Sequence, residues 1–283
     1  MNKPGEELLE FIDSVLREDI RDGDHTTLAT IDADAHGQAK LLVKEPGIVA
    51  GVDLAQWILQ HVNPETEVNI SIPDGAMVEP GDVVFTAYGR VQALLVAERT
   101  MLNFMQRMSG IATRTNKYVQ QVRHTKARIL DTRKTSPGLR QFEKWAVRLG
   151  GGHNHRMGLY DMIMIKDNHI DFCGGIEPAV KRVQAYMEQN DLNLPIEVET
   201  RNLEEVKQAL FAGGVDRIML DNFELEAMRE AVQFIRGRVE VEASGGVNLN
   251  TVKAIAETGV DYISVGELTH TIDSLDLSFK AMI

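Results

Sequence analysis

The spacing of apolar residues changes along the first third of the chain. Between Glu6 and Ile20, apolar side chains recur every three or four positions, which predicts an amphipathic helix followed by a polar loop over residues 21–27. Short apolar runs separated by Pro-Gly and Asp-Gly turns come next, and they predict strands over residues 39–43, 47–50, 67–72 and 83–87. This part of the chain therefore predicts a small antiparallel sheet with helices.

A long helical pattern extends from Val91 to Val122. Ser109 and Gly110 lie near its middle, and glycine lowers the stability of a helix interior. We therefore expect this helix to be broken or kinked at that point.

The rest of the chain repeats one unit, in which a short apolar run is followed by a polar tip and a helical pattern. The apolar runs predict strands over residues 128–130, 162–165, 195–198, 217–220, 239–242 and 262–265. The helical patterns between them cover residues 139–149, 177–189, 203–211, 224–235 and 249–257. Such alternation predicts a parallel sheet, and six units favour a closed or nearly closed α/β barrel. A doubly wound open sheet is the alternative, because periodicity alone does not distinguish the two.

Composition narrows the class of protein. The chain of 283 residues is 43% hydrophobic and 25% charged, which is typical of soluble globular proteins, and no apolar run reaches the length of about 18 residues that a membrane-spanning helix needs. The N-terminal residues lack the apolar core of a secretory signal. We expect a cytoplasmic protein with no membrane partner. The single cysteine, Cys173, excludes an intramolecular disulfide and a cysteine-based zinc cage.

Charge is distributed unevenly. The net charge of −12 disfavours nucleic acid as a partner. Between Glu98 and Lys166, however, 14 Lys and Arg face only 4 Asp and Glu, a local charge of +10 that leaves −22 for the remainder. An acidic protein with a basic centre can attract one small anion to a cleft, although a solvated basic helix face would give the same count.

Polar residues follow nearly every predicted strand of the repeat, and in parallel barrels these positions gather at one face. The tips are Asp131-Thr132-Arg133-Lys134, Lys166-Asp167-Asn168, Glu199, Asp221-Asn222, Ser244-Gly245-Gly246 and Gly266-Glu267. Helix capping explains one or two such tips, with Asp221 and Ser244 the best candidates, but not six in series.

The two late tips that contain glycine are suited to an anion. Glycines let backbone N–H groups approach closely, and the following helix N-terminus favours negative charge. Ser244, Gly245, Gly246 and Gly266 therefore predict a cradle for a monophosphate, at a place where barrels often bind one.

Cations and acids at the other tips complete a polyanion site. Arg133, Lys134, Arg156 and Lys166 combine forked and point-charge donors, a mixture suited to carboxylates and pyrophosphate. Glu199 and Asp221 can hold Mg²⁺ or face a developing positive charge, and an ion pair with Lys166 is the alternative role. The histidines at 153 and 155 sit among cations in the sequence without a third ligand, so we do not expect a metal site there.

Taken together, these stretches resemble quinolinate phosphoribosyltransferase, a type II phosphoribosyltransferase family. The matching stretches are Gly23-Asp24-His25-Thr26-Thr27, Glu98-Arg99-Thr100 with Asn103-Phe104, Asp131-Thr132-Arg133-Lys134-Thr135, Gly151-Gly152-His153-Asn154-His155-Arg156, Lys166-Asp167-Asn168-His169, Glu197-Val198-Glu199, Leu220-Asp221-Asn222 and Glu242-Ala243-Ser244-Gly245-Gly246. The resemblance covers essentially the whole chain, and the combination of motifs is highly specific.

The resemblance implies a fold and a reaction. It implies an N-terminal α/β sandwich domain, here residues 1–112 with 271–283 packing back on it, and a C-terminal open α/β (TIM-like) barrel, residues 113–270. It implies a homodimer in which Arg99 reaches the neighbouring active site. The implied reaction transfers phosphoribose from phosphoribosyl pyrophosphate to quinolinate with Mg²⁺, giving nicotinate mononucleotide, pyrophosphate and CO₂ in NAD biosynthesis.

The resemblance also implies a role for each matched residue. Arg133, His155 and Arg156, with Arg99 of the neighbour, would hold the two carboxylates of quinolinate. Lys134 and Lys166 would meet carboxylate or pyrophosphate charge, and Glu199 and Asp221 would bind ribose and Mg²⁺ and stabilise positive charge at the anomeric carbon. The 5′-phosphate would lie at Ser244, Gly245, Gly246, Gly266 and His270, and Thr132, Val265 and Glu267 complete the expected substrate-binding set.

Three other hypotheses about the function remain open from the sequence. One is a related transferase that acts on another acceptor, such as nicotinate. The second is an aldolase-like barrel that uses Lys166 as a Schiff base. The third is an anion-binding protein without catalytic activity.

Overall fold

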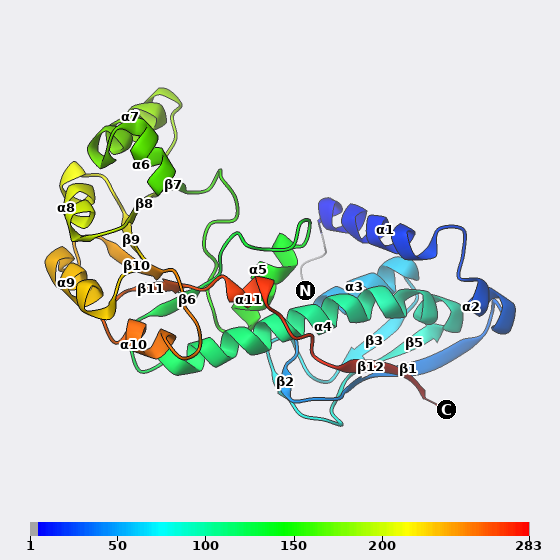
Figure 1. Cartoon of the computed structure of the whole chain (residues 1–283). Helices are drawn as coiled ribbons and strands as arrows, with labels where there is room; N and C mark the ends of the chain where they lie inside the picture. The colour runs from blue at the N-terminus through cyan, green and yellow to red at the C-terminus, as the bar shows by residue number, and fades with distance from the viewer. Residues whose placement is uncertain (1–4, 283) are drawn as a thin grey trace. The chain divides into compact units, whose positions relative to one another are not determined.

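The structure is a computed structural model that describes residues 5–282, and its chain divides into two compact units. The first unit extends to Thr113 and also includes the C-terminal segment from Ile272, whereas the second unit comprises Arg114–Thr271. Figure 1 shows the elements of both units.

A four-stranded antiparallel sheet forms the first unit, with strand order β12-β1-β5-β3. Its strands are β1 (His36–Val43), β3 (Glu67–Ile70), β5 (Val83–Arg90) and β12 (Leu277–Met282), and a separate pair is formed by β2 (Gly47–Ile48) and β4 (Met77–Val78). Every second residue of β1 from Ala39 onward is buried, which is the alternation of a sheet with one covered face. The last strand of the chain pairs with the first, so residues 277–282 belong to this sheet.

Helices α1 (Glu6–Ile20), α2 (His25–Thr30) and α3 (Val52–Val62) complete the sheet unit together with the first part of α4 (Val91–Val122). The prediction of α1 is confirmed, but the polar loop expected over residues 21–27 is wrong in its second half, because α2 begins at His25. Asp24 caps this helix by accepting a hydrogen bond from the backbone N–H of Thr27 at 3.1 Å. A six-residue helix held by its cap needs no apolar stripe, so the hydrophobic pattern did not reveal it.

The predicted break in α4 is also wrong, because residues 91–122 form one uninterrupted helix. The small residues in its middle serve packing instead. The hydroxyl of Ser109 bonds both the N–H and the carbonyl of Ala50, at 2.9 and 3.2 Å. A Cβ atom on Gly110 would lie only 2.2 Å from the carbonyl oxygen of Asp273, so glycine permits the close approach of another backbone.

Six parallel strands form the second unit: β6 (Arg128–Leu130), β7 (Ile163–Ile165), β8 (Ile196–Thr200), β9 (Arg217–Asp221), β10 (Glu240–Ser244) and β11 (Tyr262–Ser264). Their order is β6-β11-β10-β9-β8-β7, so the last strand pairs with the first and only β6 and β7 remain as edges. A barrel in sequential order places its last strand beside its first, whereas a doubly wound sheet reverses direction part-way. The arrangement is therefore an open α/β barrel, as predicted, and the doubly wound alternative is wrong.

Helices connect these strands: α5 (Arg140–Leu149), α6 (Asp167–Cys173), α7 (Ile176–Gln189), α8 (Leu203–Ala212), α9 (Leu225–Ile235), α10 (Val252–Ala256) and α11 (Glu267–His270). In Figure 1, α7, α8, α9 and α10 lie on the outer side of the strands. The short helices α6 and α11 were not predicted, and α10 is shorter than predicted. Within residues 5–282, no helix combines the length and apolar character that crossing a membrane requires.

Candidate active site

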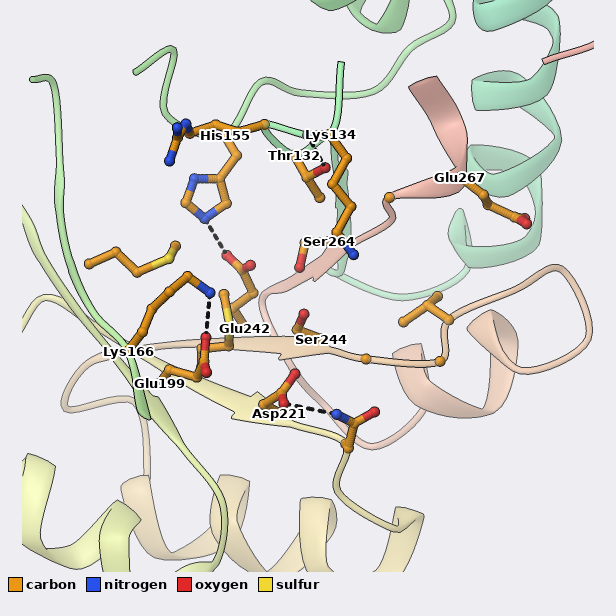
Figure 2. Close-up of a pocket in the computed structure, with 18 of the residues that line it drawn as sticks. Thr132, Lys134, His155, Lys166, Glu199, Asp221, Glu242, Ser244, Ser264 and Glu267 are labelled. Carbon is orange, nitrogen blue, oxygen red and sulfur yellow. Dashed lines mark hydrogen bonds and ion pairs between the residues drawn. The ribbon is translucent and has the colours of Figure 1, made fainter. Parts of the chain in front are cut away.

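A cavity of about 680 Å³ lies in the barrel unit at the carboxyl ends of the strands. Figure 2 shows its lining, with side chains that converge from several strands and loops. Among the residues predicted for the site, those that line the cavity are Thr132, Arg133, Lys134, His155, Arg156, Lys166, Glu199, Asp221, Ser244, Gly245, Gly246, Gly266, Glu267 and His270. The structure thus brings together residues that are up to 138 positions apart in the sequence.

Two predicted residues do not line this cavity. Val265 is fully buried and its N–H donates to the carbonyl of Leu130 at 2.9 Å, so it contributes to the sheet and not to the cavity wall. Arg99 is exposed on α4, in the first unit. Its expected reach into a neighbouring site stays a prediction.

The carboxylates lie within the strands and not beyond them. Glu199 belongs to β8, and Asp221 and Ser244 are the last residues of β9 and β10. Because side chains alternate along a strand, the residues two positions earlier face the same side. Met219 and Glu242 line the cavity accordingly, one layer below Asp221 and Ser244.

An ion pair joins two cavity residues. The Lys166 ammonium lies 2.7 Å from Oε2 of Glu199, which is the ion pair that the sequence had left open as an alternative role for this carboxylate. The Lys166 side chain is 45% exposed, so the pair is accessible to a ligand. Next to it, Asp221 accepts a hydrogen bond of 2.8 Å from the amide of Asn222.

Backbone geometry at the end of β10 requires glycine. Gly245 has φ +89° and Gly246 has φ +59°, in the left-handed region. A Cβ atom on Gly245 would lie 2.2 Å from the side-chain oxygen of Asn222. After the neighbouring strand β11, a Cβ atom on Gly266 would lie 3.1 Å from Cδ of Lys134 and 3.2 Å from Nε2 of His270. Both turns therefore keep room between polar groups, as a phosphate cradle needs.

His155 lies beside two acids, contrary to the expectation that it sits among cations. Its Nε2 is 3.1 Å from Glu197 and 3.3 Å from Glu242, and all three side chains are almost completely buried. Glu242 also accepts a hydrogen bond of 2.9 Å from Arg217. Such a trio has ligand atoms close enough for a metal ion, but Arg217 already supplies positive charge to it. His153 is exposed and is not part of this cluster.

The groups around the two ring nitrogens of His155 have different effects on its protonation. Burial lowers the pKa of His155, but hydrogen bonds and charges from Glu197 and Glu242 outweigh burial and raise it to about 9. The N–H of Arg156, in contrast, approaches Nδ1 at 2.7 Å, which suits a ring without a proton there. We assign the charged ring, because two almost completely buried acids lie within 3.1 and 3.3 Å of Nε2 and their negative charge favours the protonated form.

Two arginines, Arg133 and Arg156, line the cavity. Burial and the charge of Arg133 lower the pKa of the Arg156 guanidinium. Two cations near one another favour a ligand with two negative charges. Sequence reasoning from the strand tips missed Glu242, Met164, Met219 and Ser264 as cavity residues. Counting back by two positions from Ser244, Asp221, Lys166 and Gly266 would have found them.

Comparison with known proteins agrees with this site. The model of the quinolinate phosphoribosyl transferase N-terminal domain matches residues 24–109, and that of the C-terminal domain matches residues 111–280. The chain belongs to the quinolinate phosphoribosyltransferase family. The recognition made from sequence motifs is confirmed, and so is the assignment as an enzyme.

Relatives of this family resemble the chain over most of its length. A quinolinate phosphoribosyltransferase [decarboxylating] from Nicotiana tabacum is 48% identical and the match covers 98% of this chain and 83% of the relative. The chloroplastic nicotinate-nucleotide pyrophosphorylase [carboxylating] of Arabidopsis thaliana is 50% identical over 91% and 78% of the two chains. The crystal structure of NadC from Streptococcus pyogenes superposes with a TM-score of 0.94 at 37% identity and covers 100% of both chains.

The cytoplasmic location stays a prediction. Among the relatives, the Arabidopsis protein is named chloroplastic and one from Nicotiana glauca is named mitochondrial. Family membership therefore does not assign a compartment to this chain.

Proposed function

We propose that this protein transfers phosphoribose from phosphoribosyl pyrophosphate to the ring nitrogen of quinolinate and releases pyrophosphate and CO₂, forming nicotinate mononucleotide for NAD biosynthesis. The single observation that carries the proposal is the combination of groups in one cavity. Arg133 and Arg156 both line the cavity, Glu199 and Asp221 lie on the neighbouring strands β8 and β9, and glycine turns follow β10 and β11. Together with family membership, this inventory matches a dicarboxylate acceptor and a phosphorylated sugar donor.

The acceptor is a dianion next to a ring nitrogen, and the guanidinium pair has the complementary charge. Arg133 and Arg156 bind the two carboxylates, and the charged ring of His155 adds a third cation on that side. Charge-assisted hydrogen bonds of this kind fix orientation as well as affinity. The nitrogen is thereby aimed at the sugar, and holding two reactants in position contributes much of the rate acceleration.

The sugar donor lies toward the ends of β9 and β10. Ser244 and the N–H groups of Gly245 and Gly246 hold the 5′-phosphate, and Glu199 and Asp221 bind ribose hydroxyls. Their negative charge stabilises the positive charge that develops at the anomeric carbon while the bond to pyrophosphate breaks. Lys134 and Lys166 neutralise the departing pyrophosphate. No covalent bond to the protein is needed.

Glu199 and Asp221 also fit a magnesium ion. They offer carboxylate oxygens from adjacent strands at a cavity that is open to ligands, and Mg²⁺ prefers a few carboxylates together with substrate oxygens. When bound, the ion neutralises phosphate charge and thereby makes pyrophosphate a better leaving group. Glu199 would be one of the residues that hold the ion, and its ion pair with Lys166 leaves that ammonium next to the same oxygens.

Decarboxylation follows from the charge on the product ring. After transfer the ring nitrogen is positive, so the bond to the adjacent carboxylate can break and leave its electron pair on the ring carbon, where that charge stabilises it. CO₂ departs and a proton takes its place on the carbon. The protein contributes by keeping the ring fixed between its cations during this step.

A coupled assay tests the proposal. Quinolinate labelled in the carboxyl next to nitrogen should release labelled CO₂ when phosphoribosyl pyrophosphate and Mg²⁺ are present. Because the reaction is balanced, each CO₂ should be accompanied by one pyrophosphate. Chelation of Mg²⁺ should abolish the release. Nicotinate is the matched control acceptor, because it lacks that carboxyl. Equal turnover of nicotinate, or transfer without CO₂, would contradict the proposal. A borohydride-trapped adduct on Lys166 would favour an aldolase-like enzyme.

The arginine assignment has its own test. Arg133→Ala and Arg156→Ala should each weaken quinolinate binding by roughly 2–5 kcal/mol, because each leaves a carboxylate without a charged partner. Calorimetric titration measures this directly. Lys126→Met removes a surface cation outside the cavity and is the control that should bind quinolinate normally.

We further propose a homodimer in which Arg99 completes the neighbour's site. Arg99→Ala and Lys166→Ala chains, each inactive, can be unfolded, mixed equally and refolded. About half of the dimers should be mixed, each with one intact and one doubly altered site, so about a quarter of wild-type activity should return. No recovery, with mixed dimers confirmed by mass spectrometry, would assign Arg99 to its own barrel or to structure alone.

A further inference from the structure

A buried ion pair lies behind the cavity wall. Asp131 follows β6 directly, and its carboxylate pairs with the ammonium of Lys144 on α5. Neither side chain has any solvent exposure. Neither residue lines the cavity, so the proposed reaction does not use them.

Hydrogen bonds from this pair reach the backbone of the loop that carries His155 and Arg156. Oδ1 of Asp131 accepts the N–H of His155 at 2.8 Å, and the Lys144 ammonium donates to the carbonyl of His155 at 3.0 Å. The amide of Asn154 donates to Oδ2 of Asp131 at 2.5 Å and to the Lys144 carbonyl at 2.7 Å. The pair thus holds both peptide groups of His155.

The same pair also contacts the segment that carries Arg133. Asp131 is two residues before Arg133, and its own N–H donates to the carbonyl of His153 at 3.1 Å. Arg133 and Arg156, the two groups whose charges already interact, therefore extend from segments that are joined at Asp131. A shift at this junction would move the backbone that carries Arg133 relative to the backbone that carries Arg156.

The physical chemistry of buried ion pairs supports a role in geometry. Removing two charges from water is costly, and apolar side chains of similar size often stabilise a core as well or better. Burial raises the pKa of Asp131 and lowers the pKa of Lys144, and their mutual attraction opposes both effects. What an apolar pair cannot supply is a set of directed side-chain bonds to three groups of the loop, namely the N–H and the carbonyl of His155 and the amide of Asn154.

We infer that Asp131 and Lys144 are positioning residues that fix the spacing of Arg133 and Arg156, and so select an acceptor with two adjacent carboxylates. This inference rests on the proposed function. It assigns specificity for the acceptor to a pair that never touches it. Binding of the sugar donor, at the ends of β9 and β10, should not depend on the pair.

The test uses four variants of the full chain, of which Asp131→Asn alone is one. Lys144→Met leaves Asp131 as an isolated buried charge and serves to measure folding. The double variant Asp131→Asn with Lys144→Met is neutral and similar in size, so it should fold, but it loses the bond to the His155 carbonyl. Lys126→Met breaks the ion pair with Asp261, which is also formed between Lys and Asp but is exposed, and is the matched control.

For the double variant we expect a KM for quinolinate at least tenfold higher than that of the wild type, since small misplacements of binding groups have effects of about that size. KM for phosphoribosyl pyrophosphate should change less than about twofold. Hydrogen exchange of residues 153–157 should accelerate in the double variant and stay unchanged in Lys126→Met. The single variant Asp131→Asn, which keeps Lys144, should have a KM for quinolinate between those of the double variant and the wild type.

The outcomes separate the two proposals. An active wild type with an unchanged KM for quinolinate in a folded double variant would overturn the positioning role. Equal rises in both KM values would do the same, because they would indicate a general structural effect. A wild type that does not turn over quinolinate would overturn the proposed function, while accelerated exchange of the loop would still report on the pair.

Discussion

Two buried charged clusters lie beside the same cavity, and they are satisfied to different degrees. The carboxylate of Asp131 meets a charged partner, an amide and a backbone N–H. In the cluster of His155, Glu197, Glu242 and Arg217, by contrast, both oxygens of Glu197 and one of Glu242 take no well-aligned hydrogen bond from the described residues. The hydrogen bonds of Asp131 fix one geometry. In the cluster around His155, the protonation states of the histidine and the two acids can still change.

The two clusters therefore differ in function: the pair of Asp131 and Lys144 fixes a geometry, whereas the cluster around His155 can change its protonation. Burying a carboxylate without an aligned hydrogen-bond donor costs free energy. Such a carboxylate therefore calls for another role, such as stabilising a nearby cation. The proton on His155 is held in that way by Glu197 and Glu242. We therefore expect the first cluster to respond to substitution and the second to respond also to pH.

The largest effect should come from breaking the fixed pair. Lys144→Met should lower the free energy of unfolding by about 3–5 kcal/mol, because it leaves the Asp131 carboxylate buried without its cation. Urea denaturation measures this. The neutral double variant with Asp131→Asn should recover most of the loss. A single variant as stable as the wild type would show that the pair is not charged in the folded protein.

A pH titration addresses the second cluster. The pKa of His155 is raised from 6.5 to about 9 on folding, so its contribution to stability is fully present below pH 6.5 and is lost as the pH rises through 9. The contribution lost should be of the order of 3 kcal/mol. Urea denaturation between pH 6 and pH 9.5 should show this slope in the wild type and a shallower one in His155→Gln. Parallel slopes would contradict the charged assignment.

The two acids of that cluster should not be equivalent. Burial and the charge of Glu242 raise the pKa of Glu197, so a neutral group suits its position. Burial also acts on Glu242, but the hydrogen bond and charge of His155 and the charge of Arg217 outweigh it and lower its pKa. Glu242→Gln should therefore destabilise the fold more than Glu197→Gln, by about 1–3 kcal/mol. Thermal unfolding of both variants at pH 7 measures this difference. A Glu197→Gln variant less stable than Glu242→Gln would contradict the assigned directions of the two pKa shifts.

The smallest effect should come from an exposed pair of the same chemistry as Asp131 and Lys144. The Lys126 ammonium lies 2.6 Å from Asp261, with the lysine side chain 62% exposed. Lys126→Met should change the free energy of unfolding by less than about 1 kcal/mol, because solvent screens the pair. A loss as large as that of Lys144→Met would mean that burial is not what distinguishes the two pairs.

Particular residues show how far sequence reasoning reached. The strands from β6 to β11 were predicted within one or two residues, because short apolar runs between polar tips are distinctive. The cavity residues on their tips followed from the rule that such ends gather on one face. Helix α2 and the uninterrupted α4 were not predicted, because a cap at Asp24 and the close packing at Gly110 override the local pattern.

The sequence by itself determined the repeat of strand and helix, the cationic tips and the family motifs, because these depend on local spacing and on residue identity. Only the tertiary structure decided that β11 returns to β6, and that Glu197 and Glu242 meet at His155. Periodicity tells which side of a strand a side chain faces, but not which side chains lie opposite it. That depends on how the strands curve into the barrel. Glu197 and Glu242 are 45 positions apart in the sequence, yet in the barrel both contact His155.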